Sequence, residues 1–522
     1  MDYGGAGSDF ASNLYPLRRH VNATVSGAPL PFSPASGSDI SFVRRDFGEY
    51  LNGVARADVV LALRRALAAT SATVQYDTEI HRVVPQESSS SGETRSSVVL
   101  ELSTSGAQTM SPDSFDLVVA ADGIHSTLRT HVYGTATAQR HPALFSGVNL
   151  YYGLTPASRL TDAERAAFAP HTLTNLYGVG TSALYFGCGQ AAETTMTRGH
   201  VAQGFPDDVV GQPEAYVWAI ATRDPTPIKE SWDSVTATTG LTALLASSYS
   251  ANAPLRMLID AGLRDAVPTS DSASTVHRSA AFAHFGLYYR PPVAPWSRGG
   301  VVLLGDAAHA TLPHAGQGAN MVRAASMKGA VPGTRTATHA TPRMDGSAQA
   351  IDDAWCLAEA LASHRAASGP AAVAAALKQY DEKRLPKTSD IVKMSSLLGE
   401  VSNVQSATLA AVRDVVLGAA AGSGALVKGL AMEIVKQPVI AIGPRQRRSG
   451  PESGFRPLWN PSVLNRVFEF CLDTQTHYRV GNDGCLRPPR ILAYCLVRRG
   501  FPIRYRPCSR HGASAGHTGG PQ

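Results

Sequence analysis

A short apolar run that ends in a glycine and an aspartate is the feature that most constrains this chain. Val301–Leu304 (VVLL) is followed by Gly305–His309 (GDAAH), then by Pro313 and by Gly316–Asn320 (GQGAN). Runs of this kind are typical of buried parallel strands. Small residues after such a strand let the backbone approach a ligand closely, and a helix start beyond it offers free N–H groups. The plain structural alternative is an Asp-capped, tight strand-to-helix connection.

A second segment repeats this arrangement. Asp116–Ala120 (DLVVA) is another short apolar run, and it leads into Ala121-Asp122-Gly123, with Ser126 and Arg129 shortly after. The run predicts a buried parallel strand that stops at a loop. Taken alone, the segment also fits a strand followed by an ordinary capped helix.

Between about residues 146 and 279 the sequence is richer in aromatic strand patterns, namely 149–154, 183–187 and 215–222, with one helix near 239–248. This predicts a second domain built on a mostly antiparallel sheet. Helical spacing of apolar residues predicts helices at 56–69, 351–364 and 371–384, with further helix to about Val439. Residues 73–84 and 97–102 predict a hairpin whose serine-rich tip is mobile.

Charge and cysteine content exclude several classes of protein. The net charge is +6, but the 13 arginines and four acidic residues from Arg445 onward give that tail +9 and leave the rest near −3, so we expect no nucleic-acid face on the main body. Six scattered cysteines without CxxC spacing predict no metal site and no disulfide framework, and Cys188 and Cys356 are expected to be buried thiols.

The N-terminus lacks signal-peptide features, so a cytoplasmic location is expected. The uncharged stretch 415–427 has 13 residues, too few to span a membrane, so no transmembrane segment is expected.

Together the two segments resemble those of the class A FAD-dependent aromatic monooxygenases, the salicylate hydroxylase-like enzymes with the p-hydroxybenzoate hydroxylase fold. The first matches the pattern GD…P…GQG.N, and the second matches D…GADG..S..R with Ala120 where glycine is usual. The resemblance covers roughly Gly5 to Ser389, and Tyr289-Arg290-Pro291-Pro292-Val293 with Trp296 also fits it.

The resemblance implies a role for each matching residue. Asp306 would bind the ribityl or ribose hydroxyls of FAD, Pro313 would lie beside the isoalloxazine, and the backbone from Gly316 would face the flavin pyrimidine, where a helix dipole favours negative charge. Arg56, at the start of a helix, would lie near the pyrophosphate or ribityl chain, although it also reads as an ordinary helix-start arginine. The expected cofactor-binding residues are Arg56, Asp122, Gly123, Arg129, Gly305, Asp306, Gly316, Gln317, Gly318, Ala319 and Asn320.

The predicted fold is therefore α/β, with an incomplete FAD-binding Rossmann-like domain, a mostly antiparallel substrate domain and C-terminal helices. The expected divisions are 1–145 (first segment of the FAD-binding domain, with its first βαβ unit missing), 146–285 (substrate domain), 286–320 (second segment of the FAD-binding domain), 321–348 (an atypical insertion), 349–440 (C-terminal helices) and 441–522 (a basic, disordered tail).

Two departures from the family pattern stand out. Residues 5–13 resemble a family stretch that follows the first GxGxxG unit, so the chain is expected to start about 40 residues late, the length of one such unit. Residues 321–348 interrupt the passage from GQGAN to the helix that resumes at Gln349 (QAIDDA), at a closure cost of roughly 3 kcal/mol. An unspliced intron, a gene-model error and a genuine surface insertion all remain open.

The substrate side is less well defined. Tyr152, Tyr185 and Trp218 are candidates to line an aromatic pocket, although a sheet face that packs on a core predicts the same residues. Where relatives often carry an arginine, this chain has Tyr151-Tyr152-Gly153, which puts carboxylate recognition there in doubt. The catalytic residues themselves are not identified.

The expected function is NAD(P)H-driven hydroxylation of a small aromatic substrate by FAD and O2, through a flavin C4a-hydroperoxide, with either NADH or NADPH as co-substrate. Two alternatives remain: a catalytically impaired flavin-fold remnant, and a flavin-dependent dehydrogenase without oxygen insertion. No nucleic-acid partner is expected, and a homo-oligomer is left open.

Overall fold

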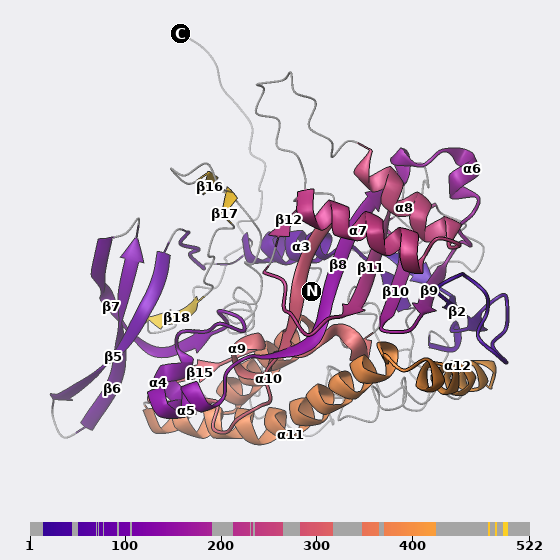
Figure 1. Cartoon of the computed structure of the whole chain (residues 1–522). Coiled ribbons are helices and arrows are strands. Elements are labelled where there is room, and N and C mark those ends of the chain that lie inside the picture. The colour runs from indigo at the N-terminus through magenta and orange to yellow at the C-terminus, as the bar shows by residue number, and fades with distance from the viewer. Residues whose placement is uncertain are drawn as a thin grey trace, which may run out of the picture.

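In the computed structural model, the described residues form two main β-sheets with helices packed against them (Figure 1). The described residues are 14–43, 51–68, 70, 72–76, 78–90, 93–104, 107–189, 212–229, 231–232, 235–264, 282–316, 347–364, 370–423, 479–480, 486–487 and 494–498.

The larger sheet has eight strands in the order β12-β13-β8-β11-β10-β9-β2-β3. Their bounds are β2 Arg19–Thr24, β3 Ser38–Asp39, β8 Leu144–Pro156, β9 Thr172–Tyr177, β10 Thr181–Cys188, β11 Ala215–Arg223, β12 Ser231–Trp232 and β13 Phe282–Tyr289. All neighbouring pairs are antiparallel except β2 and β9, which are parallel. The expected mostly antiparallel sheet is confirmed.

Two strands near the N-terminus, β2 and β3, join the eight-stranded sheet. The sequence places residues 19–39 in the FAD-binding domain, but β2 and β3 complete the edge of the eight-stranded sheet, with Val21 opposite Thr174. The reason is a parallel pairing between segments about 150 residues apart along the chain, and local sequence patterns carry no trace of such a long-range pairing.

The second sheet has the order β14-β15-β7-β6-β5, with β18 also paired to β7. Its strands are β5 Thr78–Ser90, β6 Glu93–Thr104, β7 Ala107–Ala120, β14 Ser297–Arg298, β15 Val301–Leu303 and β18 Tyr494–Arg498. β15 runs parallel to β7 with Val301 opposite Val118, which confirms the two predicted buried parallel strands. The hairpin expected near residues 73–102 is also present, as β5 and β6, but its first strand begins at Thr78.

One short strand of the tail, β18, joins the second sheet. This strand pairs antiparallel with β7, with Tyr494 opposite Ala120, so the end of β7 has a hydrogen-bonded neighbour on each side. A strand joins a sheet edge through main-chain hydrogen bonds and needs no continuous apolar face, which was the feature the tail lacked. Two small sheets complete the description: β1 Tyr15–Leu17 with β4 Leu51–Gly53, and β16 Arg479–Val480 with β17 Leu486–Arg487.

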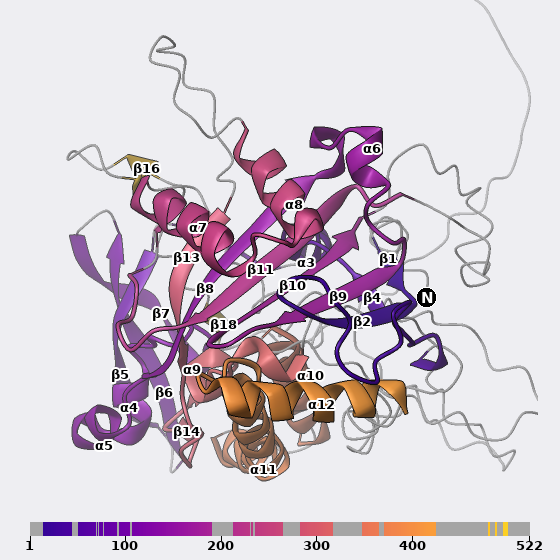
Figure 2. The same cartoon turned by 45° about the vertical axis from the view of Figure 1, so that its right-hand side comes forward.

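Helices cover both faces of the eight-stranded sheet (Figure 2). The described helices are α3 Arg56–Ala68, α4 Arg129–Tyr133, α5 Thr135–Arg140, η1 Ala157–Arg159, α6 Asp162–Arg165, α7 Val235–Ser248, α8 Ala253–Leu263, α9 Asp306–His309, η3 Pro313–Gly316, α10 Ser347–Ser363, α11 Pro370–Ser402 and α12 Ala407–Gly422. α7 and α8 lie on one face, and α11 and α12 lie on the other side. Side-chain caps fix some helix starts: Asn252 accepts from the Leu255 N–H at α8, and Ser406 accepts from the Leu409 N–H at α12.

Two hydrophobic cores correspond to this arrangement. One joins α7 and α8 to the strands through Tyr151, Trp218, Leu241, Leu258 and Phe282. The other joins β7 and β15 to α10 and α11. Cys188 and Cys356 are free and buried, as expected. Among the described residues, no single helix has the length and hydropathy to cross a bilayer; only α11 and α12 taken together, across a bend of 116°, reach that composition.

Candidate functional site: the turn at the ends of β7 and β15

The turn after β15 depends on a glycine. Gly305 has φ +59°, and a Cβ there would lie 2.9 Å from Cβ of Ala350, so both the backbone conformation and the packing favour glycine. The short helix α9 follows, with Ala307, Ala308 and His309 buried and Asp306 exposed. Asp306 is therefore the only exposed residue of α9.

A buried ionic network holds this turn from beneath. Asp353 on α10 accepts hydrogen bonds from the Gly305 N–H (2.8 Å) and from Arg384 Nε (2.5 Å), and its Oδ2 lies 2.6 Å from His309 Nε2. Burial alone would raise the pKa of Asp353, but the charges of His309 and Arg384 and the hydrogen bonds from His309 and Gly305 lower it to about 2. The carboxylate is therefore ionised and fixes both ends of α9.

The loop after β7 lies against the same turn. Gly123 has φ +78°, and Asp122 Oδ2 accepts from the Thr127 N–H at 3.0 Å. The Arg129 side chain is buried and donates from Nη1 to the Ala307 carbonyl at 2.6 Å. Burial raises the pKa of Asp122, against hydrogen bonds that lower it. The two sequence segments identified separately thus meet through one charged hydrogen bond.

Arg290 forms a second clamp between these segments. Its backbone N–H donates to the Ala310 carbonyl, and its Nη2 donates to the Ile124 carbonyl, both at 2.8 Å. Burial and the nearby Arg129 cation lower the pKa of Arg290 to about 10, which leaves it charged at neutral pH. The segment before β14 therefore links both loops.

A small cavity lies next to this region. Its volume is about 110 Å³, and Pro313 and His314 face it from η3 while Tyr152, Leu184, Val217 and Ala219 face it from the eight-stranded sheet. The cavity is thus bounded by the segment that follows α9 and by the sheet face turned toward it.

The three aromatic candidates do not share a face of the sheet. Tyr152 lines the small cavity, whereas Tyr185 and Trp218 are opposite each other in register and point to the other face, because neighbouring Leu184 and Ala219 line the cavity. Trp218 is buried among α7 and α8 side chains, and its Nε1 donates to Thr155 Oγ1. A shared aromatic pocket is therefore not formed.

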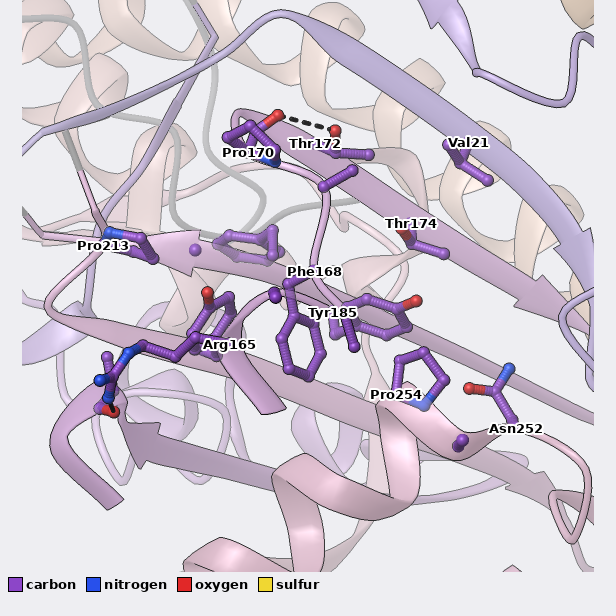
Figure 3. Close-up of a pocket in the computed structure, with 18 of the residues that line it drawn as sticks. Val21, Arg165, Phe168, Pro170, Thr172, Thr174, Tyr185, Pro213, Asn252 and Pro254 are labelled. Atoms are coloured by element: carbon purple, nitrogen blue, oxygen red, sulfur yellow. Dashed lines mark hydrogen bonds between the residues drawn. The ribbon is translucent and has the colours of Figure 1, made fainter. Parts of the chain in front are cut away.

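Tyr185 lines a larger cavity of about 1360 Å³ on that other face (Figure 3). Phe168 lies edge-on to it with ring centroids 6.0 Å apart, and Asn252, Pro254 and Arg165 lie around it. This cavity is separated from Pro313 by the sheet, so it lies apart from the turn described above.

The remaining predicted residues are only partly described. Arg56 begins α3 as expected, but its side chain lies outside what the structure describes, and Gly316 ends η3. Gln317–Asn320 and residues 321–346 of the expected insertion lie outside the described residues. Among the described residues, no group of three or more His, Cys, Asp or Glu side chains is placed to hold a metal ion.

Three residues at or beneath the candidate site were not predicted from the sequence. His314 lies within the GD…P…GQG.N run but was given no role, Asp353 was named only where the family pattern resumes, and Arg384 was not considered. The acidic pair Asp352-Asp353 on a predicted core helix was the available signal, because buried carboxylates need cationic partners.

Comparisons with known proteins agree with this geometry. Residues 258–325 match the family model described as "FAD binding domain". The chain is 28% identical over 279 residues to 3-amino-4-hydroxybenzoate 2-monooxygenase PtmB3 of Streptomyces platensis, covering 53% of this chain and 49% of the relative. It is 27% identical over 307 residues to salicylate hydroxylase of Pseudomonas putida, covering 58% of this chain and 54% of the relative. The chain thus spans about half the length of these relatives.

The fold has a solved counterpart. The crystal structure of Klebsiella pneumoniae HpxO complexed with FAD and uric acid superposes with a TM-score of 0.55 at 18% identity, covering 83% of this chain and 86% of that one. Residues 258–325 thus match an FAD-binding domain, the chain is similar over about half of its length to aromatic monooxygenases, and its fold is that of a solved FAD-binding protein.

Proposed function

We propose that this chain binds FAD at the joined turns of β7 and β15 and hydroxylates a small aromatic substrate with NAD(P)H and O2. The observation that carries the proposal is the Arg129–Ala307 hydrogen bond, which joins the two turns where two parallel strands end. Ligands of α/β proteins bind at the carboxyl ends of parallel strands.

The described residues fit a flavin in shape and polarity. Gly305 allows the tight turn after β15, and Ala307, Ala308 and Ala310 add no bulky side chain to it. The exposed Asp306 offers an acceptor for sugar hydroxyls, and Gly123 offers a second open turn, with no Cβ contact within 4 Å. When bound, FAD supplies the redox chemistry: it accepts a hydride from NAD(P)H and activates O2.

The protein would contribute position and exclusion of water. Asp353 and Arg384 hold α9 rigidly from the core side, so the carboxylate of Asp306 stays in one place. The small cavity at Pro313 gives an aromatic ring an apolar environment near the turn, in which few water molecules compete. Substrate positioning of this kind lowers the barrier mainly through orientation.

The experiment begins with flavin content. Asp306→Ala should lower FAD retention at least tenfold, because a hydrogen bond to a charged group contributes on the order of 1.5–3 kcal/mol. Asp260→Ala removes an exposed carboxylate on α8 and serves as the matched control, with unchanged flavin content. Equal flavin in the Asp306 variant and the parent chain removes this residue from the site.

Turnover separates the proposal from its alternatives. An aromatic product that gains one oxygen atom from labelled O2, in step with NAD(P)H oxidation, supports a monooxygenase. NAD(P)H oxidation without oxygen in the product indicates a dehydrogenase or oxidase. A purified chain that takes up no FAD when it is supplied contradicts the proposed function altogether.

A further inference from the structure

The described residues that line the cavity at Pro313 include no side chain that is ionised at neutral pH. Among its described lining residues there is no lysine, arginine, aspartate or glutamate. The Tyr152 side chain lines this cavity from the eight-stranded sheet. A ring substituent that enters the cavity thus meets aliphatic, aromatic, amide and hydroxyl groups.

His314 does not add a positive charge to the wall of this cavity. Burial lowers its pKa to about 4; Glu400 raises the pKa and Arg223 lowers it further, but both effects are smaller than that of burial. Its Nε2 lies 3.5 Å from Asn403 Nδ2, and Gly399 packs against the ring. At neutral pH the imidazole is uncharged, and it contributes a neutral hydrogen-bonding edge.

Two arginines beside the cavity wall are already paired. The Arg413 guanidinium, 5.4 Å from the Tyr177 ring centroid, pairs with Asp414 at 2.8 Å. Arg223 lines an adjacent cavity with His314, and both of its terminal nitrogens donate to the Glu400 carboxylate, Nη1 to Oε1 at 2.9 Å. A bidentate pair of this kind is among the stronger ion pairs and leaves little charge for a further anion. Redirecting Arg223 to a ligand would leave Glu400 without its partner.

Two polar side chains of the wall, Ser182 and Asn175, have uncharged hydrogen-bond partners. Ser182 Oγ donates to Asn403 Oδ1 at 2.9 Å, and Asn175 Nδ2 lies 2.7 Å from His20 Nε2. Burial lowers the pKa of His20 to about 4, so this pair also carries no charge at neutral pH. The described wall is therefore polar at its edge, and its own side chains carry no charge at neutral pH.

From this neutrality we infer that the cavity selects uncharged, single-ring aromatic substrates over ring carboxylates. A carboxylate moved from water into such a wall would lose its hydration without gaining a cation, and such a transfer costs several kcal/mol. The volume of about 110 Å³ admits no more than one ring, since an apolar cavity that accommodates benzene has roughly 150 Å³. The inference rests on the proposed function only in taking this cavity as the substrate site.

The test compares two ligands that share a ring and a hydroxyl group but differ in charge. Equilibrium dialysis of the FAD-supplied chain with salicylamide and with salicylate at neutral pH should give at least tenfold tighter binding of the amide. Equal binding, tighter binding of salicylate, or retention of neither ligand at millimolar concentration overturns the inference.

Two variants place the preference at Tyr152. Tyr152→Arg introduces a cation into the wall and should shift the preference toward salicylate at least tenfold, whereas Tyr152→Phe keeps the shape and the neutrality and should retain the parent preference. Circular dichroism checks that both variants are folded. A folded Tyr152→Arg chain that still prefers the amide also overturns the inference, and if that variant does not fold, the comparison on the parent chain decides.

Failure of the proposed function has a different signature. If the amide binds preferentially but neither ligand supports NAD(P)H oxidation or oxygen incorporation, the monooxygenase proposal fails while the selectivity stands. If salicylate is bound more tightly and hydroxylated, the selectivity fails while the monooxygenase proposal stands.

Discussion

Asp353→Asn should destabilise the chain by about 3 kcal/mol at neutral pH. The carboxylate is fully buried and contacts three groups, namely the Gly305 N–H, His309 and Arg384. Breaking a buried pair costs about 3–5 kcal/mol, and the value expected here lies at the lower end because Arg384 keeps a longer contact to Asp352, at 3.4 Å. The pKa change offers a second route to the magnitude: a shift from 3.8 to about 2 corresponds to about 2.5 kcal/mol.

The sign of the pH dependence follows from this depressed pKa. The contribution of Asp353 is fully present above its unfolded value of 3.8 and is lost as the pH falls through 3.8 toward about 2. The difference in unfolding free energy between the parent chain and the variant should therefore be constant from about pH 5 to 7 and shrink below about pH 4. Urea unfolding at a series of pH values measures it.

Glu359→Gln is the matched control. This residue lies on the same helix, α10, and its carboxylate meets Lys383 at 3.0 Å, with both side chains at least one-third exposed. Exposed pairs contribute about 0–1 kcal/mol. If Asp353→Asn costs no more than this control, the buried network does not stabilise the turn and the reasoning is refuted.

Three further changes test other regions of the structure. Arg129→Met should cost about 1.5–3 kcal/mol by removing the charged hydrogen bond to the Ala307 carbonyl, and flavin retention should fall with it; unchanged thermal unfolding would count against this bond. Gly153→Ala should cost about 1–3 kcal/mol in urea unfolding, because its Cβ would lie 2.2 Å from Cζ2 of Trp218; a neutral outcome would mean that the indole moves freely. Burial raises the pKa of Asp381 to about 6, so the stability linked to its protonated form is present below pH 3.8 and lost as the pH rises through 6. Asp381→Asn should therefore flatten the melting temperature between about pH 4 and 6 relative to the parent chain, and parallel curves would contradict the raised pKa.

The sequence predicted the positions of individual strands better than it predicted which strands pair with each other. The apolar runs at 116–120 and 301–304 predicted parallel strands, and the structure pairs them with each other. The pairing of β2 with β9 was missed because it joins segments about 150 residues apart through the main chain, which no local period records.

In the candidate site, too, local sequence patterns were predicted and long-range packing was not. Alternation along a strand separates Tyr152 from its neighbours but does not tell which face lies toward Pro313, so Tyr185 and Trp218 were grouped with it. The motif positions around Gly305 and Gly123 were found because their glycines meet a backbone requirement. The charges beneath them, Asp353 and Arg384, come together only through the packing of α10 on α11.

The Arg129–Ala307 hydrogen bond also limits when the two turns can pack during synthesis, because its partners are 178 residues apart in the sequence. At a synthesis rate of about 5–20 residues per second, roughly 10–40 s pass between the emergence of Arg129 and that of Ala307 from the ribosome. Throughout that interval β7 lacks its parallel neighbour β15, while the strands β8–β11 are made in between. The Arg129 guanidinium, which is buried in the folded protein, therefore remains hydrated while β8–β11 are synthesised. The two turns thus come together only late in biosynthesis.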